Sequence, residues 1–279
     1  MKKLETLFHG TSKLEFLQSI IENGFHPSYA NEYLFERRLK ILMVSFSNIP
    51  LIEARSQVNY GEYFIGLNRS WGIKNGLHPV AYTFSNSSHE INMNKLIEEA
   101  AIGQSLSSIK HYIDKGIQFE LDGDSLKRVK KLLEYEVNDE IIDLLKEIFG
   151  NVFSKTLNLV MYFKHYKVTH RNKEIYAYND REWRYIPNGD IKKVIFEKDA
   201  SGQELAQYSK WNGIDKPHFT DISLGFDLDD ISYIVVKKKN EVSRITEALF
   251  DKFNKEETLK KITTGEITIL PLEKILSDL

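Results

Sequence analysis

The chain has 279 residues, of which 42% are apolar and 12% aromatic, so it can bury a substantial core and is not a disordered segment. The formal net charge is −2 and the acidic and basic residues are well mixed, which argues against a dedicated nucleic-acid coat. The absence of cysteine excludes disulfides, thiolate zinc sites, iron–sulfur clusters and cysteine nucleophiles.

We expect a cytoplasmic protein that has no contact with a membrane. The first ten residues include two lysines but lack the apolar segment of a secretory signal. No window approaches the ~18 consecutive apolar residues that a membrane-spanning helix needs.

The first third of the chain predicts alternating strands and helices. A helix is expected at residues 14–21, where apolar residues recur at helical spacing. The hydroxyl of Thr11 or Ser12 can cap its start, and Gly24 is a natural stop. Strands are expected at residues 4–9, 41–47, 62–68 and 79–84, with a short helix from Pro50 to about Val58.

The middle of the chain has a different pattern. Residues 88–150 are rich in Leu, Ile, Glu and Lys at helical periodicity, which predicts two or more long helices divided near residues 116–125. Beyond them, strands are expected at 174–178, 183–186, 231–237 and 266–270, with a helix at 241–253. These elements indicate an α+β fold with a mixed sheet and a helical middle.

A first candidate motif is His9-Gly10-Thr11, at the end of the opening strand. A histidine at a strand terminus can point its imidazole into a cleft, and the glycine lets a ligand approach the backbone. A capping turn with a structural histidine explains the same residues.

A second motif combines hydroxyls and aromatic rings. Ser45 and Ser47 are alternate residues of a predicted strand and therefore share a face, where they could contact a ribose or orient a carboxylate. Tyr60 and Tyr63 flank Gly61 and could stack on a flat ring such as nicotinamide. An ordinary strand followed by core tyrosines is the alternative.

The third motif, Tyr178 to Pro187, is the densest polar and aromatic run in the chain. In an extended segment Glu182 and Arg184 share one face, and Arg181, Trp183 and Tyr185 share the other. A carboxylate flanked by arginines stays ionised, and an ionised carboxylate in a cleft can stabilise an oxocarbenium-like transition state. A salt-bridged edge strand is the alternative, but a tryptophan beside a run of charges is unusual on a plain surface and favours a functional site.

The sequence predicts no metal site. His165 and His170 are five residues apart, and no carboxylate lies at zinc-protease spacing. The acidic run at Asp227, Asp229 and Asp230 lacks the glycine and the distal glutamate of a calcium loop.

Several segments together resemble the AbiGi-type abortive-infection proteins of phage resistance. The similar segments are residues 8–29, 43–54, 60–82, 178–187 and 230–242, and they occur in the same order. The resemblance implies the antitoxin half of a phage-resistance pair, whose partner is a nucleotidyltransferase-like toxin or another protein of the defence system.

A more distant resemblance, to the poly-ADP-ribose polymerase-like transferases, concerns chemistry. His9-Gly10-Thr11 is similar to their HGT motif, Ser45, Ser47 and Tyr60 take the place of their second motif, and Glu182 that of their catalytic glutamate. The resemblance implies that NAD is the substrate. It further implies that His9 contacts the adenosine ribose and that Glu182 holds the nicotinamide ribose and stabilises the oxocarbenium.

These resemblances imply an ADP-ribosyltransferase-like mixed sheet core with a helical insertion. The expected division is residues 1–87 for the first half of the core, 88–157 for the insertion and 158–279 for the second half. Tyr60 and Tyr63 both compete for the role of stacking on nicotinamide.

Two functions remain open at this level. One is an NAD-dependent ADP-ribosyltransferase, or an NAD-cleaving relative, that breaks the nicotinamide–ribose bond and modifies a protein or nucleic acid. The other is a catalytically silent antitoxin that binds and neutralises a partner toxin.

Overall fold

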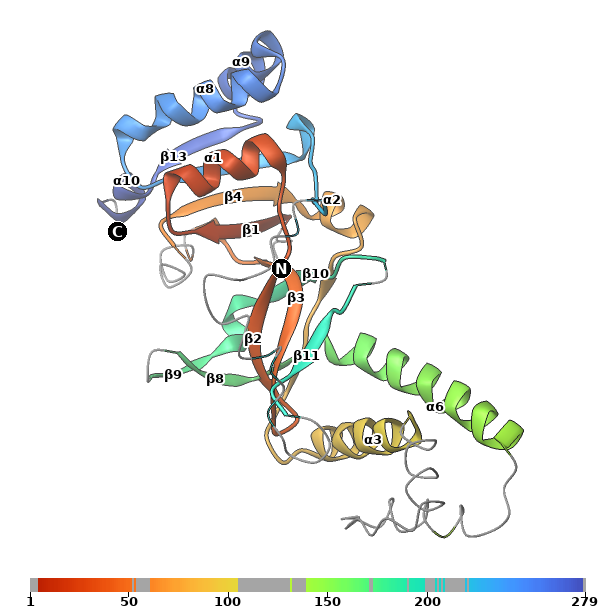
Figure 1. Cartoon of the computed structure of the whole chain (residues 1–279). Coiled ribbons are helices and arrows are strands. Elements are labelled where there is room, and N and C mark those ends of the chain that lie inside the picture. Colours follow the sequence, from red (N-terminus) through yellow and green to blue (C-terminus); the bar gives the residue numbers. More distant parts are fainter. Residues whose placement is uncertain are drawn as a thin grey trace.

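The computed structural model describes residues 5–51, 53, 61–104, 131, 139–170, 173–189, 191–198, 204, 206, 208, 219 and 221–277. These residues form a mixed sheet with helices packed on it and a pair of helices that extends away from it (Figure 1). The predicted class, an α+β protein with a mixed sheet, is confirmed.

Strands from both ends of the chain build the main sheet, which has nine strands among the described residues. These strands are β1 (Thr6–Thr11), β2 (Ser28–Leu34), β3 (Arg37–Ser47), β4 (Tyr63–Asn68), β5 (His78–Pro79), β10 (Glu182–Tyr185), β11 (Val194–Phe196), β12 (Ile231–Val236) and β13 (Thr268–Pro271). Two small sheets pair β6 (Ala81–Thr83) with β7 (Phe163–His165), and β8 (Lys167–His170) with β9 (Lys173–Tyr176).

The described helices are of two kinds. The α-helices are α1 (Leu14–Asn23), α2 (Arg69–Lys74), α3 (Ser88–Gln104), α6 (Asp139–Val160), α8 (Val242–Lys252), α9 (Lys255–Thr264) and α10 (Leu272–Ser277). Short 3-10 helices are η2 (Ala177–Asp180), η3 (Leu228–Asp230) and η4 (Lys239–Glu241).

β3 is the strand that joins two parts of the main sheet. The order of the sheet is β13-β12-β4-β1-β3-β10-β5, and β2 and β11 also pair with β3. Residues 37–43 of β3 pair with β2 and β11, whereas residues 44–47 pair with β10. All pairs in this sheet are antiparallel except β12 with β13, which is parallel.

A hairpin joins β2 to β3 and was not predicted. Its two-residue turn is Phe35-Glu36, with φ angles of 52° and 58°. Positive φ at both turn residues is the geometry that matches the twist of hairpin strands. The turn lacks the Asn-Gly or Asp-Gly pair that usually marks this geometry in a sequence, which is why the pattern did not reveal it.

The first helix begins and ends where the sequence predicted, but its cap differs. α1 ends at Gly24, whose φ of 78° suits a glycine. The prediction of a hydroxyl cap was wrong. Thr11 belongs to β1, and the N-cap residue is Lys13, which makes no side-chain capping bond. Packing of Leu14, Leu17 and Ile21 into the core therefore stabilises this helix start.

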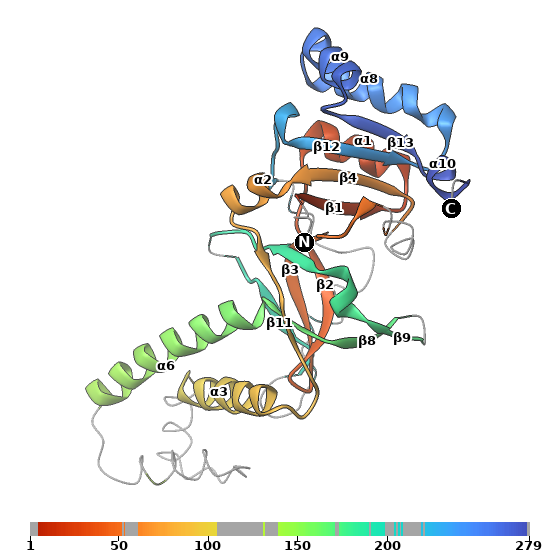
Figure 2. The same ribbon diagram turned by 180° about the vertical axis from the view of Figure 1, so that it is seen from behind.

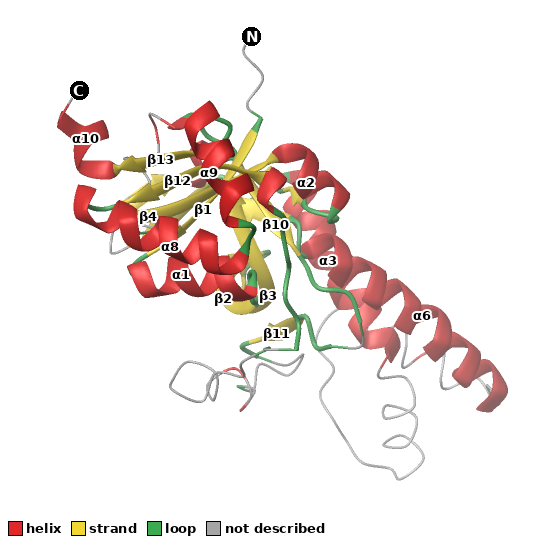
Figure 3. Cartoon of the chain, turned by 90° about the horizontal axis from the view of Figure 1, so that it is seen from above, coloured by secondary structure: helices red, strands yellow, loops and turns green. Residues whose placement is uncertain are grey.

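Helices α1 and α8 cover one face of the sheet (Figures 2 and 3). The largest core cluster fills the space beneath them and includes Leu17, Ile65, Ile234 and Leu249, all fully buried. The predicted strand–helix–strand at the end of the chain is confirmed, with α9 as an additional helix between α8 and β13.

Helices α3 and α6 pack against each other and extend beyond the sheet, as Figure 1 shows. Their presence confirms a helical middle, and α6 continues to Val160, beyond the predicted end near Gly150. The predicted division near residues 116–125 lies outside the described residues.

Three other predictions have mixed outcomes. The strand at 79–84 is interrupted at Val80, because β5 pairs with β10 while β6 pairs with β7. The strand at 174–178 ends at Tyr176, where η2 begins. Most of the helix predicted from Pro50 to Val58 lies outside the described residues.

Candidate functional site

Three neighbouring strands bring the predicted residues together. Ser47 on β3 pairs with Phe8 on β1 on one side and with Glu182 on β10 on the other. His9 follows Phe8, and Ser45 lies opposite Arg184. The first and third motifs, far apart in the sequence, are therefore separated in the sheet by one strand.

A small cavity of about 60 Å³ lies at this junction. Its lining residues are Phe8, His9, Gly10, Ser45, Phe46, Ser47, Ile49, Phe64, Lys164, Asp180 and Glu182. Five of the predicted site residues thus line one cavity. Its volume is well below the ~300–1,000 Å³ of pockets that hold a whole cofactor or drug-sized ligand.

His9 is held as a neutral imidazole between β1 and β3. Its Nδ1 lies 2.8 Å from the backbone oxygen of Ser45, and because a carbonyl oxygen only accepts, Nδ1 carries the proton. Phe25 and Phe46 lie against the ring, with centroid distances of 5.1 and 5.5 Å. Burial lowers the pKa of His9 below its ordinary 6.5. The hydrogen bond to the Ser45 oxygen raises the pKa, but this effect is smaller than that of burial.

Glu182 forms a buried ion pair with Arg184 on the same strand face, as the alternation of β10 predicted. Arg184 Nε donates to Glu182 Oε1 at 2.7 Å, and Lys164 Nζ donates to Glu182 Oε2 at 2.6 Å. Burial tends to raise the pKa of Glu182, but the two cations outweigh it and hold the pKa at about 2. The carboxylate is therefore ionised, and two positive groups offset its charge.

Arg184 extends this network across the sheet. It is fully buried, and its Nη2 donates to Glu32 Oε1 on β2 at 2.5 Å. Its Nη1 donates to the backbone oxygens of Met161 and Phe163, at 2.8 and 3.2 Å. Arg184 thus ties β2, β10 and the segment after α6 into one unit.

Tyr82, on β6, contacts the backbone of β10 at Glu182. Its hydroxyl accepts a hydrogen bond from the backbone N–H of Glu182 at 2.9 Å. Burial raises the pKa of Tyr82 above its ordinary value of 10.0, so it is a neutral phenol.

The remaining predicted residues lie elsewhere. Thr11 pairs with Tyr63 on β4, and neither is among the residues that line the cavity. Tyr63 is buried in the core and its hydroxyl donates to Glu241 at 2.9 Å. Tyr60 lies outside the described residues. Arg181 does not share a strand face with Trp183, because it precedes β10 in the left-handed conformation.

Sequence reasoning missed Lys164 and Asp180 as cavity residues. Lys164 is on β7, a three-residue strand with no periodic signal, and its partner Glu182 comes from another strand. Asp180 could have been suspected from its place in the polar run before Glu182.

A larger cavity of about 920 Å³ adjoins the small one and shares Ser45, Lys164 and Glu182 with it. Its lining residues are Ala30, Asn31, Glu32, Tyr33, Arg38, Met43, Ser45, Ser85, Lys164, His165, Lys167, Val168, Ile175, Glu182 and Tyr208. Its volume lies in the range of pockets that hold small organic ligands.

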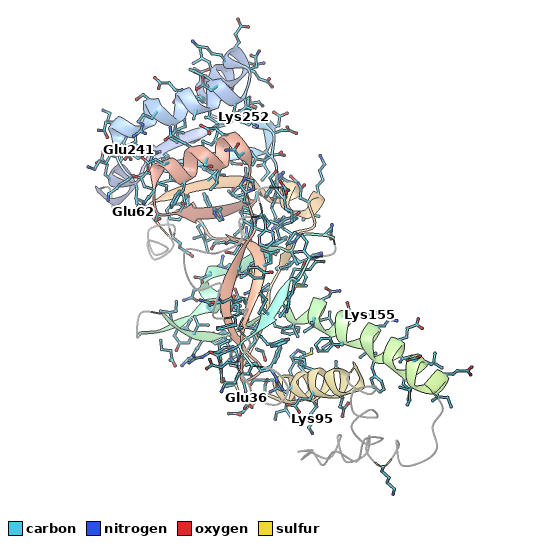
Figure 4. All side chains as sticks on the ribbon, in the orientation of Figure 1. Glu36, Glu62, Lys95, Lys155, Glu241 and Lys252 are labelled. Atoms are coloured by element: carbon cyan, nitrogen blue, oxygen red, sulfur yellow. The ribbon has the colours of Figure 1, made fainter. Side chains whose placement is uncertain are left out.

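A second candidate site is the outer face of α6. Leu144, Ile148, Val152 and Leu159 are 36–56% exposed and recur at helical spacing. We call these four residues the apolar stripe; Figure 4 labels Lys155 on the same helix. The neighbouring face of α6 contributes Val160 to the core cluster, with Phe153 packed against that cluster. The apolar surface of α6 is therefore wider than the part that the core covers, and such a surface usually has a partner.

The described residues include neither a metal-binding group nor a membrane-spanning helix. No group of three or more His, Cys, Asp or Glu side chains there could hold a metal ion. In the same part of the chain, no helix is long and apolar enough to cross a membrane.

Comparison with known proteins defines the family. The family model described as "Putative abortive phage resistance protein AbiGi, antitoxin" matches residues 24–237. The chain belongs to this family. It is also 27% identical over 252 residues to a protein from Lactococcus lactis subsp. cremoris named abortive phage resistance protein AbiGi. The alignment covers 85% of each of the two chains. No solved structure matches.

Proposed function

We propose that this chain is an antitoxin-type phage-defence protein that acts by binding a partner toxin through the apolar stripe of α6. The observation that carries the proposal is the exposure of Leu144, Ile148, Val152 and Leu159 on one helix face. Exposed apolar patches of this kind mark protein-interaction sites in folded proteins. The description of the family as an antitoxin supports the same role.

The flanks of the stripe indicate the chemistry of the partner. Glu140, Asp143 and Glu147 are exposed in the first half of α6, and Lys155 is exposed between Val152 and Leu159 in the second half. A complementary surface has an apolar centre that covers the stripe, basic groups at the rim facing the first half and an acidic group opposite Lys155. The basic rim speeds association and selects the orientation, whereas the apolar centre supplies most of the affinity.

The small cavity supports catalysis less well than it supports a structural role. Lys164 and Arg184 contact both oxygens of Glu182 and offset its charge. A carboxylate compensated in this way contributes little to stabilising a developing positive charge. The network has a sufficient structural purpose in joining β2, β7 and β10.

Co-expression with the product of a neighbouring gene that kills cells when expressed alone tests the binding proposal. The variant Leu144→Lys with Ile148→Lys is expected to lose co-purification of the toxin and protection of cells by at least tenfold. Ile73→Lys with Leu259→Lys is the matched control, because these residues are 61% and 50% exposed on other helices. Wild-type binding and protection by the stripe variant, with the melting temperature unchanged, would refute the proposal.

A second candidate function is an NAD-dependent ADP-ribosyltransferase or NAD glycohydrolase. The specific observation in its favour is that His9, Gly10, Ser45, Ser47 and Glu182 line one cavity. The cavity of about 60 Å³ is too small for a dinucleotide, but the adjoining one of about 920 Å³ is of suitable size. Under this proposal the acceptor is a protein or nucleic acid.

Incubation of the purified chain with NAD labelled in the nicotinamide ring tests this second candidate. Release of nicotinamide by the wild type, its loss in Glu182→Gln and its retention in Glu266→Gln would support an enzyme. Glu266 is the matched control because it also pairs with a lysine, Lys261 at 2.9 Å, but is 54% exposed and lines neither cavity. Absence of release, both alone and with phage lysate, would exclude the enzyme while leaving the binding proposal intact.

A further inference from the structure

A polar cluster lies outside the network of Glu182, where β6 and β7 meet the start of α3. Ser85 Oγ lies 3.4 Å from His165 Nδ1, and His165 Nε2 lies 2.9 Å from Glu90 Oε1. Glu90 and His165 are only 3% and 5% exposed, whereas Ser85 is exposed. Among the described residues neither His165 Nε2 nor Glu90 Oε1 has a hydrogen-bond partner, so their contact is close but is not an aligned hydrogen bond. The three side chains therefore lie in contact from the exposed Ser85 to a buried carboxylate.

Local structure holds each member in place. The parallel pairing of β6 with β7 sets Thr83 beside His165, so the loop after Thr83 carries Ser85 past the imidazole. Ser87 caps α3 by accepting a hydrogen bond from the Glu90 N–H at 3.2 Å. The Asn86 N–H donates to Glu90 Oε2 at 2.7 Å, so one carboxylate oxygen is fixed and the other lies next to His165.

The contact with Glu90 places a proton acceptor beside one nitrogen of the imidazole. Because a carboxylate oxygen only accepts, a proton on Nε2 leaves Nδ1 as the acceptor toward Ser85. A serine, a histidine that accepts from it and a buried carboxylate beside the second ring nitrogen are the parts of an activated nucleophile. If Glu90 served only to cap α3 and His165 only to fill the core, the Ser85 hydroxyl would have no reason to lie beside Nδ1 of His165.

We propose that Ser85, His165 and Glu90 form a nucleophile–base–carboxylate site that cleaves carboxylic esters. Ser85 Oγ bonds to the ester carbonyl carbon while its proton passes to His165 Nδ1, and Glu90 stabilises the resulting imidazolium. The carbon–alkoxy bond then breaks, and the alcohol leaves with the proton from Nδ1. Water attacks the acyl-serine, gives its proton to Nδ1 and releases the acid, and the proton returns to Ser85 Oγ.

The adjoining cavity defines the substrate class. Ser85 and His165 both line the cavity of about 920 Å³, and Met43, Val168 and Ile175 give it apolar walls. Lys164 lines the same cavity, but its ammonium group already pairs with Glu182 at 2.6 Å, so we assign it no part in ester cleavage. The apolar lining residues suit an ester with a short acyl chain.

Labelling of the full chain with a biotinylated fluorophosphonate tests the site, because the probe reacts only with activated serines and releases fluoride. We expect the wild type to be labelled at Ser85, as mapped by peptide mass spectrometry, and to hydrolyse 4-nitrophenyl butyrate. Ser85→Ala should abolish both signals. Ser88→Ala, an exposed serine at the start of α3, is the matched control and should keep both.

His165→Gln should lower the labelling rate by at least 100-fold, and Glu90→Gln by at least tenfold with an altered pH profile. Because Ser85 is exposed, the Ser85→Ala variant is expected to fold. Ser85→Ala therefore tests the proposal even if the His165→Gln variant fails to fold. An unlabelled wild type, or equal labelling of wild type and Ser85→Ala, would overturn the proposal. Neither result bears on partner binding by the apolar stripe or on release of nicotinamide.

Discussion

Arg184 donates from Nε to Oε1 of Glu182 at 2.7 Å, and both side chains are buried on the same face of β10. This pair joins the candidate cavity to the rest of the fold, because Arg184 also contacts Glu32 and two backbone carbonyls. A guanidinium suits this position, since its planar array of donors reaches several acceptors at once. The same contacts that ionise Glu182 also offset its charge, and this favours a structural role for it.

Arg184→Met should destabilise the fold by about 3–5 kcal/mol, because it leaves two carboxylates near the cavity without their main partner. Urea unfolding followed by circular dichroism measures the change. Arg38→Met is the matched control, because Arg38 is 66% exposed and lies 3.5 Å from Glu197. Its effect should stay below about 1 kcal/mol. Similar losses in both variants would contradict the assigned importance of the buried network.

Acid should destabilise the protein through Glu182. Its pKa is about 2 in the folded chain against an ordinary 4.5, so the folded state binds fewer protons than the unfolded state as the pH falls. The stabilisation is fully present above about pH 5 and is lost between there and about pH 2, on the order of 3 kcal/mol in total. Unfolding measured at several pH values should show this slope. The slope should be weaker in Glu182→Gln, and an equal slope in both proteins would contradict the prediction.

His9 should affect the stability of the fold in a higher pH range than Glu182 does. Burial lowers its pKa below the ordinary 6.5, so stability is present above that value and begins to fall as the pH drops through it. Nuclear magnetic resonance titration should give the His9 ring a pKa below 6.5, with the signal assigned from His9→Asn. Asparagine can still donate to the Ser45 oxygen but does not titrate, so the variant should lose this part of the pH dependence. A His9 pKa at or above 6.5 would contradict the assignment of a neutral imidazole.

Glu36→Gly should stabilise the hairpin of β2 and β3. Glu36 has a φ of 58°, a conformation that costs a residue with a side chain about 1 kcal/mol and costs glycine little. We expect a gain of up to about 1 kcal/mol in unfolding free energy. Glu36→Ala removes the same carboxylate but keeps the Cβ, so it should show no gain. Equal effects of the two substitutions would indicate that the carboxylate, and not the backbone, controls stability at this turn.

Elements with a strong periodic signal were predictable, and those defined by pairing were not. The helix ended by Gly24 and the strand–helix–strand at 231–271 follow local spacing, which the sequence displays directly. β2 and β7 carry no such signal, because β2 does not alternate apolar and polar residues and β7 has only three residues, so both depend on the strands that pair with them. The Thr11 or Ser12 cap failed because β1 extends through Thr11 to pair with β4.

By itself, the sequence determined that Glu182 and Arg184 share a face, since alternate residues of any strand do so. It also identified His9, Ser45 and Ser47 as candidates for the same site. Only the tertiary structure decided that β1, β3 and β10 are neighbours and that Lys164 reaches Glu182. The tertiary structure also decided the surroundings of His165. The sequence suggested only a weak metal site with His170, whereas in the fold His165 lies beside Glu90 and Ser85. The physical reason is that pairing between distant segments depends on packing of the whole core, whereas periodicity depends on the local backbone alone.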